Sequence, residues 1–229
     1  MNWKGDFLMF DQIHEECGVF GVYSPESTTS VVGDTYMALY ALQHRGQQSC
    51  GIAVNDDGII RSYRDLGLVP DTFNQRVLSD LGSGRMAVGH VLYGASNPER
   101  ADAQPLVVRH IKGSMALAFN GALVNALELK EELELKGAIF HSNSDAEIIS
   151  HVIINERLHT NSIEEAIEKA MDKLKGAYSM VVMSPQKLMA VRDPQGIRPL
   201  AMGKMGGEIV FASESCCLLY TSDAADDGE

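Results

Sequence analysis

The sequence has 229 residues, 45% of them hydrophobic and 22% charged, which is the composition of a globular protein with one sizeable core. Its formal charge of -12 comes from 31 acidic and 19 basic residues, and no Lys/Arg run is present that would neutralise a nucleic-acid backbone. No stretch approaches the roughly 18 apolar residues of a membrane span, and residues 1–16 lack the apolar run of a secretion signal. We therefore expect a protein that binds neither nucleic acid nor membranes.

The first half of the chain alternates short apolar runs with turn signals. Residues 17–23 (CGVFGVY) predict a buried strand that begins at the cysteine, and residues 34–43 predict a helix. Residues 51–63 (GIAVNDDGIIRSY) predict a hairpin, because two short β runs flank Asn-Asp-Asp-Gly. Further strands are predicted over residues 86–93 and 114–119.

The second half predicts helices first and then strands. Helical patterns cover residues 125–136, 145–158 and 163–174, and residues 144–147 (SDAE) match a capping box. Residues 177–184 and 187–193 predict strands joined by a turn at Pro185, and residues 209–213 predict a last strand. Helices and strands in separate blocks predict an α+β fold with antiparallel sheets. Residues 218–229 are acidic and small toward their end, and we expect them to be disordered.

The four cysteines are Cys17, Cys50, Cys216 and Cys217. Their spacing fits neither the CxxC pairs of a zinc or iron-sulfur site nor a secreted disulfide framework, so we predict no metal site and a reducing, cytoplasmic location. Taken alone, Cys17 in its apolar run would more often be an inert core residue than a nucleophile.

Other motifs change that interpretation of Cys17. They are residues 15–21 (EECGVFG), 43–49 (QHRGQQS), 89–91 (GHV), 120–121 (NG) with Asn125, 144–147 (SDAE) and 192–200 (RDPQGIRPL), the last followed by residues 211–215 (FASES). In this order and spacing they resemble the amidophosphoribosyltransferases, over residues 13 to about 217. The resemblance implies their glutamine-hydrolysing domain, which belongs to the N-terminal-nucleophile hydrolases and folds as a four-layer αββα sandwich. We expect this domain to span residues 17–217.

The resemblance makes Cys17 the catalytic nucleophile once a leader, residues 1–16, has been cut away. Cleavage creates a free α-amine with a pKa of about 7.7–8.0, which takes the proton of a thiol whose pKa is about 8.5. By the same resemblance, the Asn120 side-chain amide and the Gly121 backbone N–H form the oxyanion hole. The alternative for Asn120 and Gly121 is a simple hairpin turn.

Three further residues are assigned by resemblance to substrate binding. Asp145 holds the α-amino group of glutamine, and Arg45 and Gly46 lie near the nucleophile. Two alternatives stay open: Asp145 is also explained as a residue that stabilises a helix N-terminus, and Arg45 as a surface residue.

The chain departs from the family pattern at Leu92. The family motif reads Gly-His-x-Arg-Tyr, and its arginine clamps the glutamine α-carboxylate, which an aliphatic side chain does not replace. Arg100 is a candidate substitute. A second departure follows Cys217, where the family continues into a phosphoribosyltransferase domain and this sequence differs. We therefore expect at most a glutaminase from these residues.

For a full-length parent, the resemblance implies ammonia transfer from glutamine to a phosphoribosyltransferase domain, in the first committed step of purine biosynthesis. It also implies a homo-oligomer, Mg and, in some members, an iron-sulfur cluster, with no cofactor in the present residues. Two rival hypotheses remain. One is a catalytically impaired binding or assembly fragment, which Leu92 favours; the other is a different N-terminal-nucleophile amidase, such as an acylase, whose substrates lack a free α-carboxylate.

Overall fold

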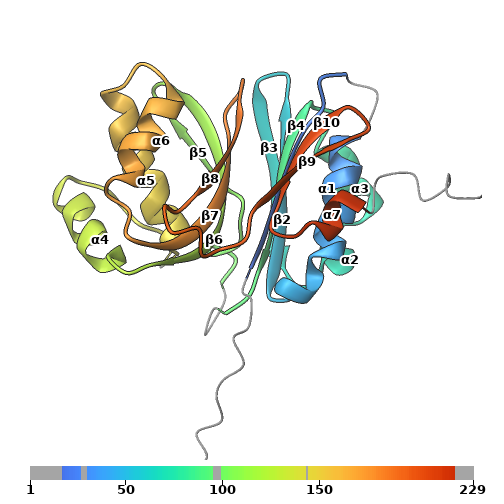
Figure 1. The fold of residues 1–229 in the computed structure, drawn as a ribbon, viewed down its shortest axis with the longest axis horizontal. Coiled ribbons are helices and arrows are strands. Elements are labelled where there is room, and N and C mark those ends of the chain that lie inside the picture. Colours follow the sequence, from blue (N-terminus) through green and yellow to red (C-terminus); the bar gives the residue numbers. More distant parts are fainter. Residues whose placement is uncertain (1–16, 27–29, 95–98, 143, 220–229) are drawn as a thin grey trace, which may run out of the picture.

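The structure, a computed structural model, describes residues 17–26, 30–94, 99–142 and 144–219. Within these residues, ten strands form two antiparallel sheets that pack face to face, and helices cover the outer face of each sheet (Figure 1). The predicted α+β class and the four-layer αββα sandwich are confirmed. Residues 1–16 and 220–229 lie outside the described residues, so cleavage of the leader and disorder of residues 220–229 stay predictions.

The first sheet has the strand order β3-β2-β4-β1-β10-β9. Its strands are β1 (Gly18–Tyr23), β2 (Ser49–Asp56), β3 (Ile59–Leu66), β4 (Met86–Leu92), β9 (Ala201–Met205) and β10 (Glu208–Ala212). Its outer face carries α1 (Val31–Ala41), α2 (Val69–Thr72), α3 (Gln75–Asp80) and α7 (Cys216–Leu219), and a 3-10 turn, η1 (Gln43–Arg45), follows α1. Helix α7 therefore extends two residues past the expected domain end at 217, so the expectation of disorder is wrong for residues 218–219.

The second sheet has the order β5-β6-β7-β8. Its strands are β5 (Leu106–His110), β6 (Gly113–Leu123), β7 (Gly176–Met183) and β8 (Leu188–Arg192). Helices α4 (Ala126–Leu135), α5 (Asp145–Leu158) and α6 (Ile163–Met171) cover its outer face (Figure 1). The two sheets thus present one face each to the other and one face each to helices.

Side chains alternate between the two faces of a strand, so each strand contributes to two layers of the core. On β1, Phe20 and Val22 face the helices, whereas Val19 faces the opposite sheet. Val88 of β4 and Val181 of β7 lie in the same central layer as Val19. Polar side chains on the inward faces are therefore removed from water by both sheets.

The predicted hairpin at residues 51–63 is confirmed as β2 and β3, with Asp57 and Gly58 in left-handed conformations at the turn. Two strands, β5 and β9, were not predicted. Both lie at sheet edges and keep several residues partly exposed, so their sequences lack the strong apolar signal of central strands. Helix α1 begins at Val31 rather than at residue 34, because Ser30 Oγ caps it by accepting from Gly33 N (3.2 Å).

Candidate active site

Cys17 immediately precedes β1 and adopts a left-handed backbone conformation with φ of 60°. Such a conformation is costly for a residue other than glycine and persists only where neighbouring groups hold it. Here the Cys17 N–H donates to the carbonyl oxygen of Arg45 (3.1 Å), and the Cys17 thiol donates to the carbonyl oxygen of Tyr93 (3.5 Å). The side chain is 9% exposed. The predicted nucleophile is therefore fixed by two hydrogen bonds at the start of β1.

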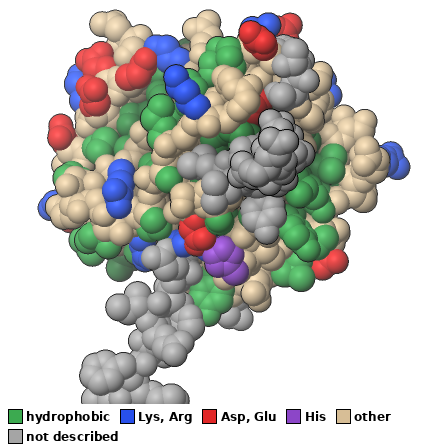
Figure 2. All heavy atoms as spheres, turned by 45° about the vertical axis from the view of Figure 1, so that its right-hand side comes forward, with side chains coloured by type: hydrophobic (Ala, Val, Ile, Leu, Met, Phe, Trp, Pro, Cys, Tyr) green, Lys and Arg blue, Asp and Glu red, His purple; other side chains and the backbone are tan. Residues whose placement is uncertain are grey.

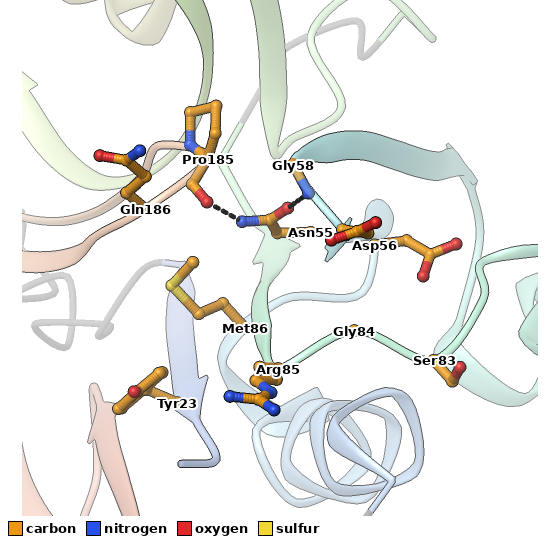
Figure 3. A pocket seen from close by; sticks show the side chains of 11 residues that line it. Tyr23, Asn55, Asp56, Gly58, Ser83, Gly84, Arg85, Met86, Pro185 and Gln186 are labelled. Atoms are coloured by element: carbon orange, nitrogen blue, oxygen red, sulfur yellow. Dashed lines mark hydrogen bonds between the residues drawn. The ribbon is translucent and has the colours of Figure 1, made fainter. Parts of the chain in front are cut away.

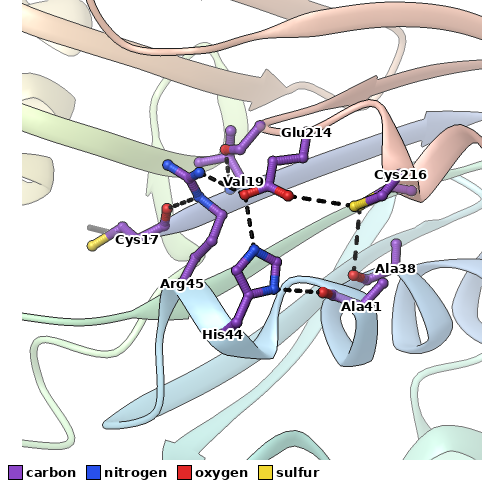
Figure 4. A network of polar contacts seen from close by, with 10 residues as sticks. Cys17, Val19, Ala38, Ala41, His44, Arg45, Glu214 and Cys216 are labelled. Carbon is purple, nitrogen blue, oxygen red and sulfur yellow. Dashed lines mark hydrogen bonds and ion pairs between the residues drawn. The ribbon is translucent and has the colours of Figure 1, made fainter. Parts of the chain in front are cut away.

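Arg45 holds the same residue from its other side. Its Nε donates to the Cys17 carbonyl oxygen (2.8 Å), and its Nη1 donates to Glu214 Oε1 (2.7 Å), as Figure 4 shows. Arg45 is only 2% exposed, so the alternative of a surface residue is wrong. The charge-assisted hydrogen bonds of Nε and Nη1 offset part of the cost of burying the guanidinium. Arg45 contacts the backbone of the predicted nucleophile directly.

Glu214 is a residue that the sequence interpretation missed. Its Oε1 also lies 2.9 Å from His44 Nε2, and its Oε2 accepts from the Cys216 thiol at 3.5 Å (Figure 4). Burial acts to raise the pKa of Glu214, but the hydrogen bonds from Arg45 and His44 outweigh it and lower the pKa. Glu214 is therefore a carboxylate that stays ionised beside Arg45. Its block, residues 211–215 (FASES), is part of the resemblance, but nothing in that block indicates its partner Arg45, 169 residues away in the chain.

The backbone of Gly46 packs closely against the backbone of the last two residues of β4. A Cβ at this position would meet Val91 C at 2.6 Å and Leu92 N at 2.7 Å. Glycine is therefore required for the close approach that brings Arg45 to Cys17, whatever further contact Gly46 makes with a substrate.

Leu92, where the family pattern has arginine, is 9% exposed and pairs with Ser49 across β2 and β4. It lies two residues after His90 on the same strand, so both side chains point into the space between the sheets. Arg100, considered above as a substitute, forms an ion pair with Asp65 of β3 (Nη2–Oδ2 3.4 Å), and 65% of its side chain is exposed.

Asn120 lies inside strand β6, opposite Ser179 of β7. The alternative of a hairpin turn at Asn120 and Gly121 is therefore wrong. Asn120 is fully buried, and among the described residues its Oδ1 and Nδ2 have no hydrogen-bond partner. Leaving a buried amide unpaired costs about 1–3 kcal/mol, so an amide in this state is a candidate for binding a ligand.

The register of the strands brings Asn120 to the same end of the central layer as Cys17. The start of β1 lies beside the end of β4, near Val91. The neighbouring residue His90 then links the sheets, because its Nε2 lies 2.9 Å from the carbonyl oxygen of Phe119. Asn120 directly follows Phe119. Asn120 is therefore next to the point where β6 contacts β4, the strand that pairs with the start of β1.

Asp145 begins α5, but Ser144 rather than Asp145 is the N-cap. Asp145 Oδ2 accepts from Leu123 N (2.8 Å), which ties the start of α5 to the end of β6, three residues beyond Asn120. Burial raises the pKa of Asp145, and the Leu123 N–H partly opposes the rise. The predicted capping box is only half formed, because the Glu147 carboxylate accepts from His141 N and Ser142 N instead of returning to Ser144.

Comparison with known proteins identifies the family of the chain. Residues 95–220, over half of the chain, match the family model described as a glutamine amidotransferase domain. The chain belongs to this family. The matched residues include Asn120, Gly121 and Asp145 but not Cys17.

Two relatives show how much of a longer protein this chain matches. The chain is 43% identical over 203 residues to an amidophosphoribosyltransferase of Methanocaldococcus jannaschii, a match that covers 88% of this chain and 43% of the relative. It also superposes, with a TM-score of 0.81 and 38% identity, on the structure of the glutamine phosphoribosylpyrophosphate amidotransferase from B. subtilis complexed with ADP and GMP, covering 90% of this chain and 44% of that one. The chain thus spans less than half the length of these relatives.

Two pockets in the amidotransferase domain lie away from Cys17. The larger, about 440 Å³, is lined by Tyr23 and Met86 at the opposite end of β1 and β4 (Figure 3). Its Asn55 is already satisfied, because Nδ2 donates to the Pro185 carbonyl oxygen (2.7 Å) and Oδ1 accepts from Gly58 N (2.8 Å). The other pocket, about 330 Å³, lies near Lys187 and the α6 N-terminus. Neither pocket contains a predicted site residue.

The described residues also bear on metals and membranes. In them, no three His, Cys, Asp or Glu side chains are grouped so as to hold a metal ion, and the four cysteines are free. None of their helices has the length and apolar character needed to cross a membrane. On the face shown in Figure 2, Lys and Arg side chains are scattered among acidic and hydrophobic ones and form no continuous basic surface.

Proposed function

We propose that Cys17, exposed as the N-terminal residue by removal of residues 1–16, is the nucleophile of glutamine hydrolysis in this domain. The observation that carries the proposal is the placement of Cys17. Arg45 binds both its N–H and its C=O, and the fully buried Asn120 amide lies at the same end of the central layer with no partner among the described residues. One residue is thus oriented for attack, and another has donors available for the charge that attack creates.

The proposed reaction uses the chain's own groups at each step. The Cys17 α-amine takes the thiol proton, and the sulfur attacks the side-chain amide carbon of glutamine to form a tetrahedral oxyanion. Asn120 Nδ2 and Gly121 N–H donate to this oxyanion, and ammonia leaves with the proton that the amine returns. Water then hydrolyses the γ-glutamyl thioester to glutamate. Asp145 accepts from the substrate's α-amino group, and the reaction needs no metal or other cofactor from these residues.

We further propose that the ammonia serves phosphoribosylamine formation in a longer cytoplasmic parent of the amidophosphoribosyltransferase type. The support is the similarity to such enzymes over nearly the whole of the described chain. In that parent the acceptor is a phosphoribosyltransferase domain, the assembly is a homo-oligomer, and Mg or an iron-sulfur cluster belongs to the parts beyond this chain.

Intact-mass spectrometry tests the assignment of Cys17. The purified chain is measured before and after treatment with a diazo-ketone analogue of glutamine, which alkylates a nucleophile that recognises glutamine. We expect the mass of residues 17–229 and then one adduct, whereas Cys17→Ala stays uncut and unlabelled. Cys50→Ala is the matched control and behaves like the wild type, because burial raises the pKa of the Cys50 thiol to about 11. An uncut, unlabelled wild-type chain contradicts the proposal.

A further inference from the structure

The contacts of Arg45 continue beyond Cys17 to a carboxylate that touches no predicted substrate group. Arg45 Nε donates to the Cys17 carbonyl oxygen at 2.8 Å, and Arg45 Nη1 donates to Glu214 at 2.7 Å. We propose that Glu214 is a positioning residue for the nucleophile and acts through Arg45. The inference rests on the proposed role of Cys17 and gives a role to a residue to which the resemblance assigned none.

Arg45 needs an anchor because its own side chain is long and flexible. Fixing such a side chain costs rotamer entropy, and a buried guanidinium loses its hydration. Glu214 offsets both costs with a charge-assisted hydrogen bond to Nη1, while Nε remains directed at Cys17. Because two nitrogens of one rigid plane have different partners, the guanidinium cannot rotate without losing one of them.

Cys17 needs Arg45 because its backbone is in an unfavourable conformation. At φ of 60° its carbonyl oxygen is held by the guanidinium, and its N–H is held by the Arg45 carbonyl oxygen. These two contacts orient the bonds from which both the thiol and, after cleavage, the α-amine extend. A movement of Arg45 therefore changes the angle between the attacking sulfur and its base.

Glu214 is itself fixed relative to β1. The preceding residue, Ser213, exchanges two hydrogen bonds with Val19: Ser213 N donates to Val19 O (3.0 Å), and Val19 N donates to Ser213 Oγ (2.9 Å). His44 Nε2 holds the Glu214 carboxylate from the side of η1 at 2.9 Å. The segment that follows β10 is thus joined to the nucleophile's own strand two residues from Cys17, which makes Glu214 a rigid support for Arg45.

The first test compares Glu214→Gln with the wild type in glutamine hydrolysis. We expect kcat to fall by about 10- to 100-fold, because a displacement of about 1 Å at a reacting group costs up to about 100-fold, and KM to change by less than about threefold. The matched control is Glu156→Gln, which removes another partly buried paired carboxylate (Oε1–Lys173 Nζ 2.6 Å) away from Cys17 and leaves both constants unchanged. A rise in KM with unchanged kcat would mean that Arg45 serves substrate binding and would overturn the inference.

A second test separates a role through Arg45 from a general loss of structure. In an Arg45→Lys background, Glu214→Gln should add little further loss of kcat, because residues that act through one contact are not additive. Equal losses in both backgrounds contradict the proposal. Glu214→Asp keeps the charge and should recover part of the kcat that Glu214→Gln loses, and it replaces Glu214→Gln as the main variant if that one does not fold.

A third measurement does not depend on glutamine. Alkylation of Cys17 by iodoacetamide, a small neutral reagent, should become faster in Glu214→Gln, because loosening the 9%-exposed Cys17 uncovers its thiol. If Glu214→Gln changes neither the alkylation rate nor kcat, the role of Glu214 is overturned and the proposed glutaminase activity is not affected. If the wild-type chain itself does not hydrolyse glutamine, the proposed function is overturned instead. The role of Glu214 is then decided by the alkylation rates of the wild type and Glu214→Gln.

Discussion

At the scale of single residues, the polar groups around Cys17 are matched to partners or left available for a substrate. Arg45 is paired with Glu214, and Asp145 is bound by a backbone N–H. Leu92 is the exception, because it places an aliphatic side chain on the inward face at the end of β4, where the family pattern has an arginine. The proposed glutamine site therefore lacks the partner that the family pattern predicts for the α-carboxylate of glutamine.

We predict that Leu92→Arg lowers the KM for glutamine by about 10- to 100-fold, since a hydrogen bond to a charged group contributes about 1.5–3 kcal/mol. Steady-state hydrolysis at several glutamine concentrations measures the change. Leu92→Gln, which adds a polar group of similar size without charge, is the control and leaves KM near the wild-type value. An equal KM in Leu92→Arg and the wild type would show that the carboxylate is bound elsewhere, and hydrolysis only in Leu92→Arg would favour the impaired-fragment hypothesis.

At the scale of elements, the connection from α1 to β2 decides how Arg45 reaches Cys17. Gln43 braces η1 on both sides: its Nε2 donates to the Gly46 carbonyl oxygen, and its Oε1 accepts from Val69 N (2.7 Å). Gly46 then packs directly on the backbone of β4. The position of the guanidinium is therefore set by the packing of this short connection.

Gly46→Ala should lower the free energy of unfolding by about 1–3 kcal/mol and slow diazo-ketone labelling of Cys17, because the new Cβ would lie within 2.6–2.8 Å of β4 backbone atoms. Gly33→Ala in α1 is the control. Among the described residues, its Cβ would meet only Ser30 atoms, at 3.4–3.5 Å, so the substitution should stabilise the helix by about 0.5–1 kcal/mol and leave labelling unchanged. Urea unfolding and labelling kinetics measure both, and a Gly46→Ala protein of wild-type stability and labelling rate would refute the packing argument.

At the scale of the whole molecule, the two sheets are joined through a polar contact inside an apolar layer. His90 of β4 is fully buried, and its Nε2 lies 2.9 Å from the carbonyl oxygen of Phe119 in the other sheet. Burial lowers the pKa of His90 to about 4, against a partial opposing effect of that hydrogen bond. Folded His90 is therefore neutral at pH 7 and donates from Nε2.

This burial predicts a loss of stability in mild acid. Between about pH 6.5 and 4 the unfolded chain binds a proton at His90 and the folded chain does not, so the free energy of unfolding falls as pH falls, by an amount on the order of 3 kcal/mol. Asp34, whose pKa burial raises to about 6, acts in the opposite direction. The free energy of unfolding is therefore measured in urea for the wild type and for His90→Gln, from pH 7 to pH 4. If the two free energies change with pH in parallel, the effect of His90 is disproved.

The sequence alone was sufficient for the fold class, the central strands and the main helices, and it pointed to Arg45 near Cys17 but missed Glu214. Central strands and amphipathic helices are readable because burial imposes an apolar period on each of them. The edge strands β5 and β9 were missed because partial exposure removes that period. The catalytic and substrate-binding roles of Cys17, Arg45 and Asp145 stay predictions from motif resemblance.

Contacts between distant segments were decided only by the tertiary structure. Within a local window, Asn120 and Gly121 favour a hairpin turn, and only the pairing of β6 with β7 shows that they lie in a strand. The pairing of Arg45 with Glu214 joins residues 169 apart in the chain. A buried charged residue needs a partner, and this need is clear from its residue type. Which partner it meets depends on how the strands and helices pack, and the local pattern of apolar residues does not contain that information.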